Sequence, residues 1–401
     1  MNYFMMKRNN LKYIDDFMKK EYEEISQEDY FLNKELSVTE VEDGIILPVL
    51  NTNKYNTSKG AGGVIDKELN YIESSAQLAY NMKNRVYGKY DIENEKIEYD
   101  NETVIYGNFF YKHWGHFIID IVSRLWYLLE DNSENKAKIV FTTMINDEHT
   151  KIDGNYKEFL NLFGISDDRI LLINKPTKFK KIIIPECSIY PGKYYTKEYI
   201  KIFEKVRDSV KRNPNIPEKI YLSRSKFKKA KEKEIGEKEI EKFFNNNGYY
   251  SISPEQMTLT EQIQFFRDSK EIVCISGTLP HNIMFANEGK DIIIINKTYK
   301  LNKHQEIINQ AQKANVTYLD LHISLFPVAY GKGPFIMTIN KNLQRFAKDR
   351  TYNLKIRITQ KIKNIYKKVW YLIQYLKIYK FKIYDDGKTN WKELFKFYIL
   401  K

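Results

Sequence analysis

The chain has 401 residues and is 42% hydrophobic, which is enough material for the cores of about two domains. Its net charge of +13 comes almost entirely from residues 345–401, where sixteen Lys and Arg accompany four Asp and Glu. Residues 1–344 carry 49 basic and 48 acidic side chains, a balance that argues against a protein binding nucleic acid over its whole surface.

The two cysteines are too few for a disulfide framework and favour a reducing compartment. Residues 1–20 mix charges with short apolar runs, unlike a secretory signal peptide. No stretch approaches the roughly 20 apolar residues that cross a bilayer. We therefore expect a soluble or peripheral protein.

The first half of the chain is predicted to alternate strands and helices. Residues 1–100 read as short strands and turns, with an apolar run at 38–50 and a glycine-rich turn at 59–63. Beyond them we expect strands at 138–142, 169–173 and 181–185, and helices beginning near 112, at 156–163 and at 197–211. This alternation is typical of a layered α/β domain. The proline-containing segment 213–217 is the expected domain boundary.

The second half predicts a parallel sheet. Apolar strands are expected at 219–222, 249–253, 271–275, 291–296 and 317–321, and helices at 234–246, at 258–268 and from Pro280. Strands without alternation, each followed by a helix, indicate a sheet covered on both faces. The predicted organisation is an α/β domain at 1–212, a Rossmann-like domain at 213–335 and a basic helical tail at 336–401.

The segment 108–126 holds the strongest candidate for chemistry. His113, His116 and Asp120 are spaced at i, i+3 and i+7, so on a helix they share one face. A carboxylate that orients an imidazole is the usual construction of a general base near neutral pH. The ordinary alternative for either histidine is a satisfied residue of the core.

The same histidines make a weak metal motif. Helical zinc sites of hydrolases space two histidines at i, i+4 with a glutamate between them, and His113 and His116 do not match that pattern. The chain also lacks Asp-x-Asp, a usual clamp for a divalent metal and a diphosphate. We expect no metal ion and no other cofactor.

A second candidate site lies at the carboxyl end of the strand 271–275, the edge where open parallel sheets bind ligands. Gly277 lets backbone amides approach an anion, so the amides of Gly277, Thr278 and Leu279 would hold a phosphate at a helix start. His281 and Asn282 are polar in an apolar helix entrance and need partners. The alternative is an ordinary strand-to-helix turn.

Arg224 follows the strand 219–222 at the same predicted edge. A guanidinium suits a diphosphate because it binds oxygens in pairs. A solvated arginine is the alternative. The lysine-rich run 226–233 is interpreted mainly as a solvated face, with phosphate contact as its other reading.

The tail carries apolar residues every three or four positions, with lysines on the other faces. These residues are Leu354, Ile358, Ile362, Ile365, Val369, Leu372, Leu376 and Tyr379. A basic amphipathic helix of this kind can lie on an anionic membrane surface. It can also pack on the protein body, or bind a partner or nucleic acid.

Residues 108–129 and 219–296 together resemble glycosyltransferase family 61. The resemblance rests on His-Trp-Gly-His-Phe-Ile-Ile-Asp at 113–120 with Arg124-Leu-Trp126, then Tyr-Leu-Ser-Arg at 221–224, Gly236-Glu237, Pro254-Glu255 with Glu261-Gln262, and Ser-Gly-Thr-Leu-Pro-His-Asn at 276–282 with Phe285. Order and spacing agree across about 190 residues. Family members often have Asn-Glu in place of Gly236-Glu237 and His-Gly-Ala in place of Ser276-Gly277-Thr278, and both departures lie in the donor half.

The resemblance implies a GT-B architecture, in which two Rossmann-like domains face each other across a cleft and the second binds the nucleotide-sugar. It implies inverting transfer without a required metal, with the terminal segment crossing back to the first domain. His116 paired with Asp120 would be the base, with Asp120 or His113 as alternatives. Arg224 and the 277–279 amides would hold the leaving diphosphate, and Glu255 would contact the ribose or base.

The expected function is therefore a bacterial glycosyltransferase that moves a sugar from a nucleotide-sugar to a glycan or lipid-linked acceptor of capsule or lipopolysaccharide. We expect a cytoplasmic enzyme held at the inner face of the cell membrane by residues 345–401, without nucleic acid as a partner. One rival is a non-catalytic protein that binds membrane or nucleic acid through its tail. Another is a metal hydrolase that uses the histidine pair.

Overall fold

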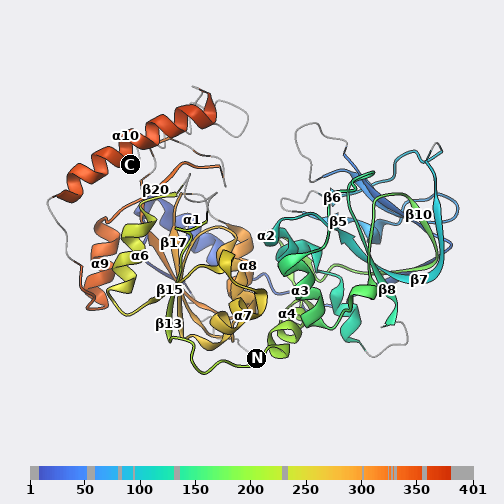
Figure 1. Ribbon diagram of the computed structural model, residues 1–401, viewed down its shortest axis with the longest axis horizontal. Helices are drawn as coiled ribbons and strands as arrows, with labels where there is room; N and C mark the ends of the chain where they lie inside the picture. Colours follow the sequence, from blue (N-terminus) through green and yellow to red (C-terminus); the bar gives the residue numbers. More distant parts are fainter. Residues whose placement is uncertain are drawn as a thin grey trace. The chain divides into compact units, whose positions relative to one another are not determined.

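The computed structural model describes residues 9–51, 59–79, 84–93, 95–130, 136–227, 234–299, 302–323, 325–326, 328, 332–354 and 359–380. The chain divides into two compact units (Figure 1). We call Asp29–Lys211 the N-unit, and Met1–Glu28 with Arg212–Lys401 the C-unit.

The C-unit is built on a six-stranded sheet in which every pair of neighbouring strands is parallel. Its order is β1 (Asn9–Tyr13), β18 (Asn315–Asp320), β17 (Asp291–Asn296), β16 (Glu271–Ile275), β13 (Lys219–Leu222) and β15 (Tyr250–Ile252). The predicted strands 219–222, 271–275 and 291–296 are confirmed at both ends. Each begins with a charged residue and continues through a buried, mainly apolar run, which is why the sequence defines them well.

Helices separate most of these strands along the chain. They are α1 (Asp16–Gln27), α6 (Glu237–Asn245), η6 (Pro254–Gln256), α7 (Leu259–Asp268), η7 (Leu279–Phe285), α8 (Lys303–Ala311), α9 (Lys341–Asp349) and α10 (Thr359–Tyr379). The capping box that begins α7 is confirmed, because the Thr258 hydroxyl accepts from the Glu261 N–H and the Glu261 carboxylate accepts from the Thr258 N–H.

The predicted helix 234–246 begins later than expected. Glu234–Ile235 form the short strand β14, which pairs with β20 (Phe335–Met337) and through it with β19 (His322–Ile323). The break falls at Gly236, whose φ of 90° is left-handed. A Cβ at Gly236 would lie 2.0 Å from the Met337 carbonyl oxygen, so the close approach of β20 requires glycine there.

Two parts of the chain lie outside their predicted domains. The expected domain 1–212 loses β1 and α1 to the C-unit, because β1 adds a sixth parallel strand beside β18. In the predicted tail 336–401, Phe346 of α9 is fully buried and its ring packs against Tyr13 at 5.2 Å. The described helices of this segment, α9 and α10, belong to the C-unit.

The N-unit contains a seven-stranded sheet. Its order is β4 (Ala61–Ile65), β3 (Ile45–Leu50), β10 (Thr177–Pro185), β7 (Glu98–Phe109), β8 (Lys138–Thr142) and β9 (Ile170–Ile173), and β2 (Val38–Glu42) also pairs with β10. The last four strands of this order are parallel, and β2, β3 and β4 are antiparallel additions. The α/β prediction is confirmed, with antiparallel strands that the C-unit sheet lacks.

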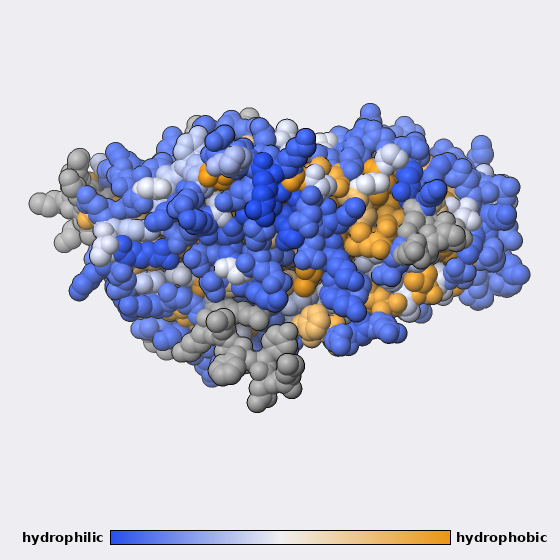
Figure 2. Space-filling view, turned by 90° about the horizontal axis from the view of Figure 1, so that it is seen from below, coloured by the Kyte–Doolittle hydropathy of each residue, from blue (hydrophilic) through white to orange (hydrophobic). Residues whose placement is uncertain are grey.

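Helices α3 (Gly154–Phe163) and α4 (Lys197–Ser209) belong to the N-unit, together with the short elements η1 (Glu73–Ser75), η5 (Asp167–Arg169), β5 (Gln77–Leu78), β6 (Asn84–Val86), β11 (Ile189–Tyr190) and β12 (Tyr194–Tyr195). The predicted glycine-rich turn is mostly part of β4. Among the helices that the structure describes, none combines the length and the hydropathy needed to cross a membrane. Figure 2 shows one face, on which hydrophilic residues predominate and hydrophobic ones form smaller patches.

Candidate functional site

The backbone after β7 takes an unusual course that sets up the first site. A single α-helical turn, α2 (Trp114–His116), leads into the π-helix η2 (Phe117–Ile121), and η3 (Leu125–Leu129) follows as a 3₁₀-helix. The predicted continuous helix is therefore three short pieces. π-Helical turns occur often at functional sites because they shift the side chains that follow them. Here the turn carries Asp120, which lies four residues after His116.

Asn108 and Arg124 hold this turn in place. Asn108, at the end of β7, has a φ of 93° and donates to the carbonyl oxygens of Asp120 and Ile121 at 3.3 and 3.2 Å. Its own oxygen accepts from Arg124 Nε at 2.6 Å. Arg124 is fully buried and also donates to three main-chain carbonyls, those of Pro185, Ser74 and Ala76. Arg124, which is part of the resemblance to the family, therefore has a structural role.

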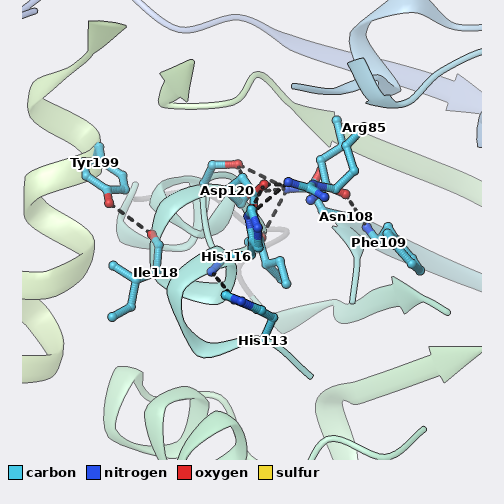
Figure 3. Close-up of polar contacts among 11 residues, drawn as sticks. Arg85, Asn108, Phe109, His113, His116, Ile118, Asp120 and Tyr199 are labelled. Carbon is cyan, nitrogen blue, oxygen red and sulfur yellow. Dashed lines mark hydrogen bonds and ion pairs between the residues drawn. The ribbon is translucent and has the colours of Figure 1, made fainter. Parts of the chain in front are cut away.

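Three further side chains meet at this turn (Figure 3). Arg85 Nε donates to Asp120 Oδ2 at 2.9 Å, and Arg85 Nη2 lies 3.0 Å from His116 Nδ1. His116 Nδ1 lies 3.4 Å from the same carboxylate oxygen. Arg85 and Asp120 are 5% and 3% exposed and His116 is 29% exposed, so the imidazole is the member that a substrate can reach. Arg85 comes from β6, far from the other two in sequence.

This contact between His116 and Asp120 is the one that the sequence predicts, but Arg85 shares it. A guanidinium can only donate, so its N–H group toward His116 Nδ1 leaves the imidazole proton on Nε2. In that tautomer His116 donates a hydrogen bond. For Nε2 to accept a proton, the ring proton must instead lie on Nδ1 and face Asp120, with Arg85 donating to the carboxylate alone. The contact with Arg85 therefore bears on which ring nitrogen carries the proton.

Electrostatics favour a charged Asp120. Burial alone would raise its pKa, but the Arg85 charge and the hydrogen bond with His116 lower it below the ordinary value. Its second oxygen, Oδ1, is buried without a hydrogen-bond partner among the described residues, as is the Tyr111 hydroxyl. Unpaired buried polar atoms of this kind are uncommon, and catalytic sites are one of the places where they occur.

His113 lies beside this cluster as the N-cap of α2. Its Nδ1 accepts from the His116 N–H at 3.4 Å, and the two imidazole rings are 4.6 Å apart. Desolvation and the neighbouring His116 lower the pKa of His113 below its ordinary value. His113 is therefore neutral at pH 7 and suited to hydrogen bonding with a sugar hydroxyl.

A polar cavity of about 480 Å³ opens in the same unit, where β8 and β9 end. Thr143 and Asn174 line it directly after these strands, and Lys157 of α3 lines it one residue after Tyr156. The Tyr156 ring contacts that of Trp114 at 5.6 Å, so α3 joins the cavity wall to the histidine turn. The carboxylate, amide and hydroxyl groups that line the cavity are groups that bind sugar hydroxyls.

The second site lies in the C-unit at the point where the strand order reverses. Along the chain β13 is followed by β15 on one side and by β16 on the other, so the switch point lies between β13 and β16. Ligands of doubly wound sheets bind beyond the carboxyl ends of the strands at this point. Arg224 and Gly277 follow these two strands, as the sequence predicts.

A buried chain of charges crosses this edge. Arg224 Nε donates to Glu234 Oε2 at 3.0 Å, and Lys297 Nζ donates to Glu234 Oε1 at 2.6 Å. Lys297 follows β17, and its ammonium lies 3.6 Å from where a Cβ on Gly277 would stand. Burial lowers the pKa of Lys297, against the attraction of Glu234. Two cations and one glycine thus lie at the ends of three adjacent strands.

Glu237 completes this group. Its Oε1 accepts from the Arg224 N–H at 2.5 Å, so it fixes the backbone where the arginine leaves the strand. Glu237 is 3% exposed, and burial raises its pKa to about 7. The residue that the resemblance singles out after Gly236 is therefore a positioning group for Arg224.

Other predicted donor residues lie apart from these charges. His281 and Asn282 are buried in η7, and the partner that His281 needs is Gln305 of α8, at 2.8 Å. The helix predicted from Pro280 is present as the 3₁₀-helix η7, which begins at Leu279, and Thr278 makes no capping hydrogen bond to it. Thr278 and Leu279 stay half-buried at the edge, and Glu255 is exposed after β15. The run 228–233 lies outside the described residues.

Sequence reasoning missed Arg85, Glu234 and Lys297. A carboxylate inside the apolar run 117–126 requires a cation, but nothing in the sequence says which of the 65 basic residues supplies it. Lys297 had a signal, because it directly follows an apolar strand of the sheet. Within the described ranges, no group of three or more His, Cys, Asp and Glu side chains is arranged to hold a metal ion.

Comparison with known proteins points the same way as these sites. The sequence model of the family Glycosyltransferase 61 matches residues 114–293. This range contains His116, Asp120, Arg224 and Gly277. No curated protein matches the chain.

Proposed function

Because the sequence model of glycosyltransferase family 61 matches residues 114–293, we propose that the chain transfers a sugar from a nucleotide-sugar to a hydroxyl of a glycan acceptor. The donor is assigned to the C-unit edge and the acceptor to the histidine turn of the N-unit. The observation that carries the proposal is the contact of His116 with the buried Asp120, inside the range that the family model matches.

On the donor side, Arg224 and Lys297 would hold the leaving diphosphate. Glu234 forms an ion pair with each of the two cations, so neither lies at this edge without a counter-charge. A diphosphate would share or replace that carboxylate, and positive charge at the leaving oxygens would stabilise the transition state. Gly277 lies beside Lys297, and its φ of 137° is one that residues with a Cβ rarely adopt.

On the acceptor side, a single displacement needs a base that removes the proton of the attacking hydroxyl. We assign that proton to His116 Nε2, with Nδ1–H held by Asp120. His113 would orient the acceptor through a hydrogen bond. Direct attack from one face inverts the anomeric carbon, and cations in place of a metal ion make the transfer metal-independent.

We further propose that the acceptor is a surface polysaccharide under construction, such as a bacterial capsule or lipopolysaccharide chain, and that transfer takes place at the cytoplasmic face of the cell membrane. The basic C-terminal residues support this part of the proposal through their charge. Nucleic acid is not a proposed partner, because residues 1–344 are electrically balanced.

A panel of nucleotide-sugars tests the proposal. The full chain should bind one nucleoside diphosphate sugar in titration calorimetry, and transfer to a matching oligosaccharide should yield a product of inverted anomeric configuration by NMR. Activity should persist in excess chelator. Retained configuration would contradict the assigned base, and failure of every donor to bind would favour a non-catalytic binding protein.

A further inference from the structure

Helix α10 has two unlike faces. Its inner face is anchored on the C-unit through polar side chains spaced three or four residues apart. Lys367 Nζ donates to Glu239 at 2.6 Å, and the Tyr371 hydroxyl donates to the Phe326 carbonyl at 3.0 Å. Tyr371 and Tyr375 are 1% and 3% exposed. The helix is therefore held in one orientation by contacts with the body of the unit.

The opposite face is apolar and exposed. It consists of Ile362, Ile365, Tyr366, Val369, Leu372, Ile373 and Leu376, which are between 39% and 73% exposed. These positions recur every three or four residues, so they form one stripe along the helix. We call them the α10 stripe. Aliphatic side chains gathered in this way on a soluble surface usually mark a site that binds a partner or a membrane.

Charge identifies the partner. Exposed lysines flank the stripe on both sides, Lys377 and Lys363 on one and Lys368 on the other, and Lys363 also pairs with Glu239 at 3.5 Å. The sequence has no acidic residue from 350 to 384. Two copies of α10 packed stripe to stripe would bring like charges together, whereas an anionic lipid surface would neutralise them.

We propose that the α10 stripe docks on an anionic bilayer, with its aliphatic side chains between the lipid headgroups and its flanking lysines on the phosphates. The helix would lie in the plane of the interface, as basic amphipathic helices do. Because the inner face is anchored, docking would set the orientation of the whole C-unit on the membrane. This inference rests on the proposed location at the membrane, which it assigns to one face of α10, and its test does not require sugar transfer.

Vesicle binding of the full chain tests the inference. Flotation is compared on vesicles of phosphatidylglycerol mixed with phosphatidylcholine and on phosphatidylcholine alone. We expect the chain to float with the anionic vesicles only. The double variant Ile365→Ser/Val369→Ser should bind at least about tenfold more weakly, since two aliphatic side chains no longer enter the interface. Lys368→Gln/Lys377→Gln should also weaken binding, by about fivefold for each lysine.

A matched control removes two exposed aliphatic side chains from the N-unit, in Leu69→Ser/Ile97→Ser, whose residues are 44% and 42% exposed. Its binding should equal that of the unchanged chain. Equal binding of the α10 variant and this control would overturn the proposal, as would equal binding to neutral vesicles. A dimer in sedimentation velocity that Ile365→Ser/Val369→Ser abolishes would also overturn it, in favour of a second copy on the stripe.

Discussion

Arg85 Nε donates to Asp120 Oδ2 at 2.9 Å, and both side chains are at least 95% buried. The two buried charges stabilise each other, because burying either one without its counter-ion would cost free energy. The pair also touches His116 through both members. A structural ion pair and the proposed catalytic base are therefore one unit, and a change in either partner should affect stability and transfer together.

The first prediction concerns the coupling of this pair. Asp120→Asn leaves Arg85 buried without its counter-ion, so the free energy of unfolding should fall by about 3 kcal/mol. Arg85→Gln/Asp120→Asn should lose less than the sum of the two single changes, by at least about 1 kcal/mol. Urea unfolding of the three variants measures this coupling. Additive losses would show that the two side chains do not stabilise each other.

The second prediction concerns pH. Burial raises the pKa of Glu237 to about 7, so between pH 4.5 and 7 the folded chain keeps a proton that the unfolded chain releases. Stability from this group is present below pH 4.5 and is lost as the pH rises through 7. The loss should reach about 3 kcal/mol by pH 8. Glu237→Gln removes the titrating carboxyl group, while the oxygen of the glutamine side chain can still accept from the Arg224 N–H. The variant should therefore not show this loss of stability with rising pH. Urea unfolding measures the free energy of unfolding at pH 5 and pH 8. An equal change in the unchanged chain and in Glu237→Gln would contradict the assignment to Glu237.

The third prediction tests the structural role of Arg124. Arg124→Met leaves the Asn108 oxygen and three buried carbonyls without their donor, so unfolding free energy should fall by about 3 kcal/mol or more. Arg345→Met removes the same charge from the exposed side of α9 and should change stability by less than about 0.5 kcal/mol. Similar losses of unfolding free energy in the two variants would mean that Arg124 does not stabilise the fold through these hydrogen bonds.

The fourth prediction concerns the donor. Lys297→Met should weaken binding of the nucleotide-sugar by about tenfold to a hundredfold, because a charge-assisted hydrogen bond to the diphosphate is lost. Lys313→Met is the control, since Lys313 pairs with Glu288 at the exposed surface of the same unit. Calorimetry with the nucleoside diphosphate and with the nucleoside alone localises the loss. An equal loss for the nucleoside would show that Lys297 does not act on phosphate.

Elements are predicted best from the sequence where burial or a local pattern alone determines the structure. The apolar strands 271–275 and 291–296 are found at their predicted bounds because burial on both faces leaves few alternatives, and the capping box at Thr258 is a local pattern. The contact of His116 with Asp120 was predicted from spacing, although the helix between them is π-helical. Local spacing was enough because four residues bring the two side chains to one side in either helix.

Long-range pairing was not predictable from one sequence. Residues 9–13 resemble any short polar segment, and their place beside β18 depends on contacts with residues more than 300 positions away. Arg85 is equally inconspicuous until β6 brings it to Asp120. His281 shows the reverse, because its polar character suggested a ligand and its partner is Gln305.

The central claim is that His116, oriented by Asp120, removes a proton from the acceptor hydroxyl. It is tested most directly by kcat of sugar transfer in His116→Ala and Asp120→Asn, with the donor Kd measured on the same proteins. We predict that kcat falls by about a hundredfold or more, that the donor Kd stays within about twofold because neither residue belongs to the C-unit, and that His113→Ala costs less. A His116→Ala enzyme with unchanged kcat would contradict the account.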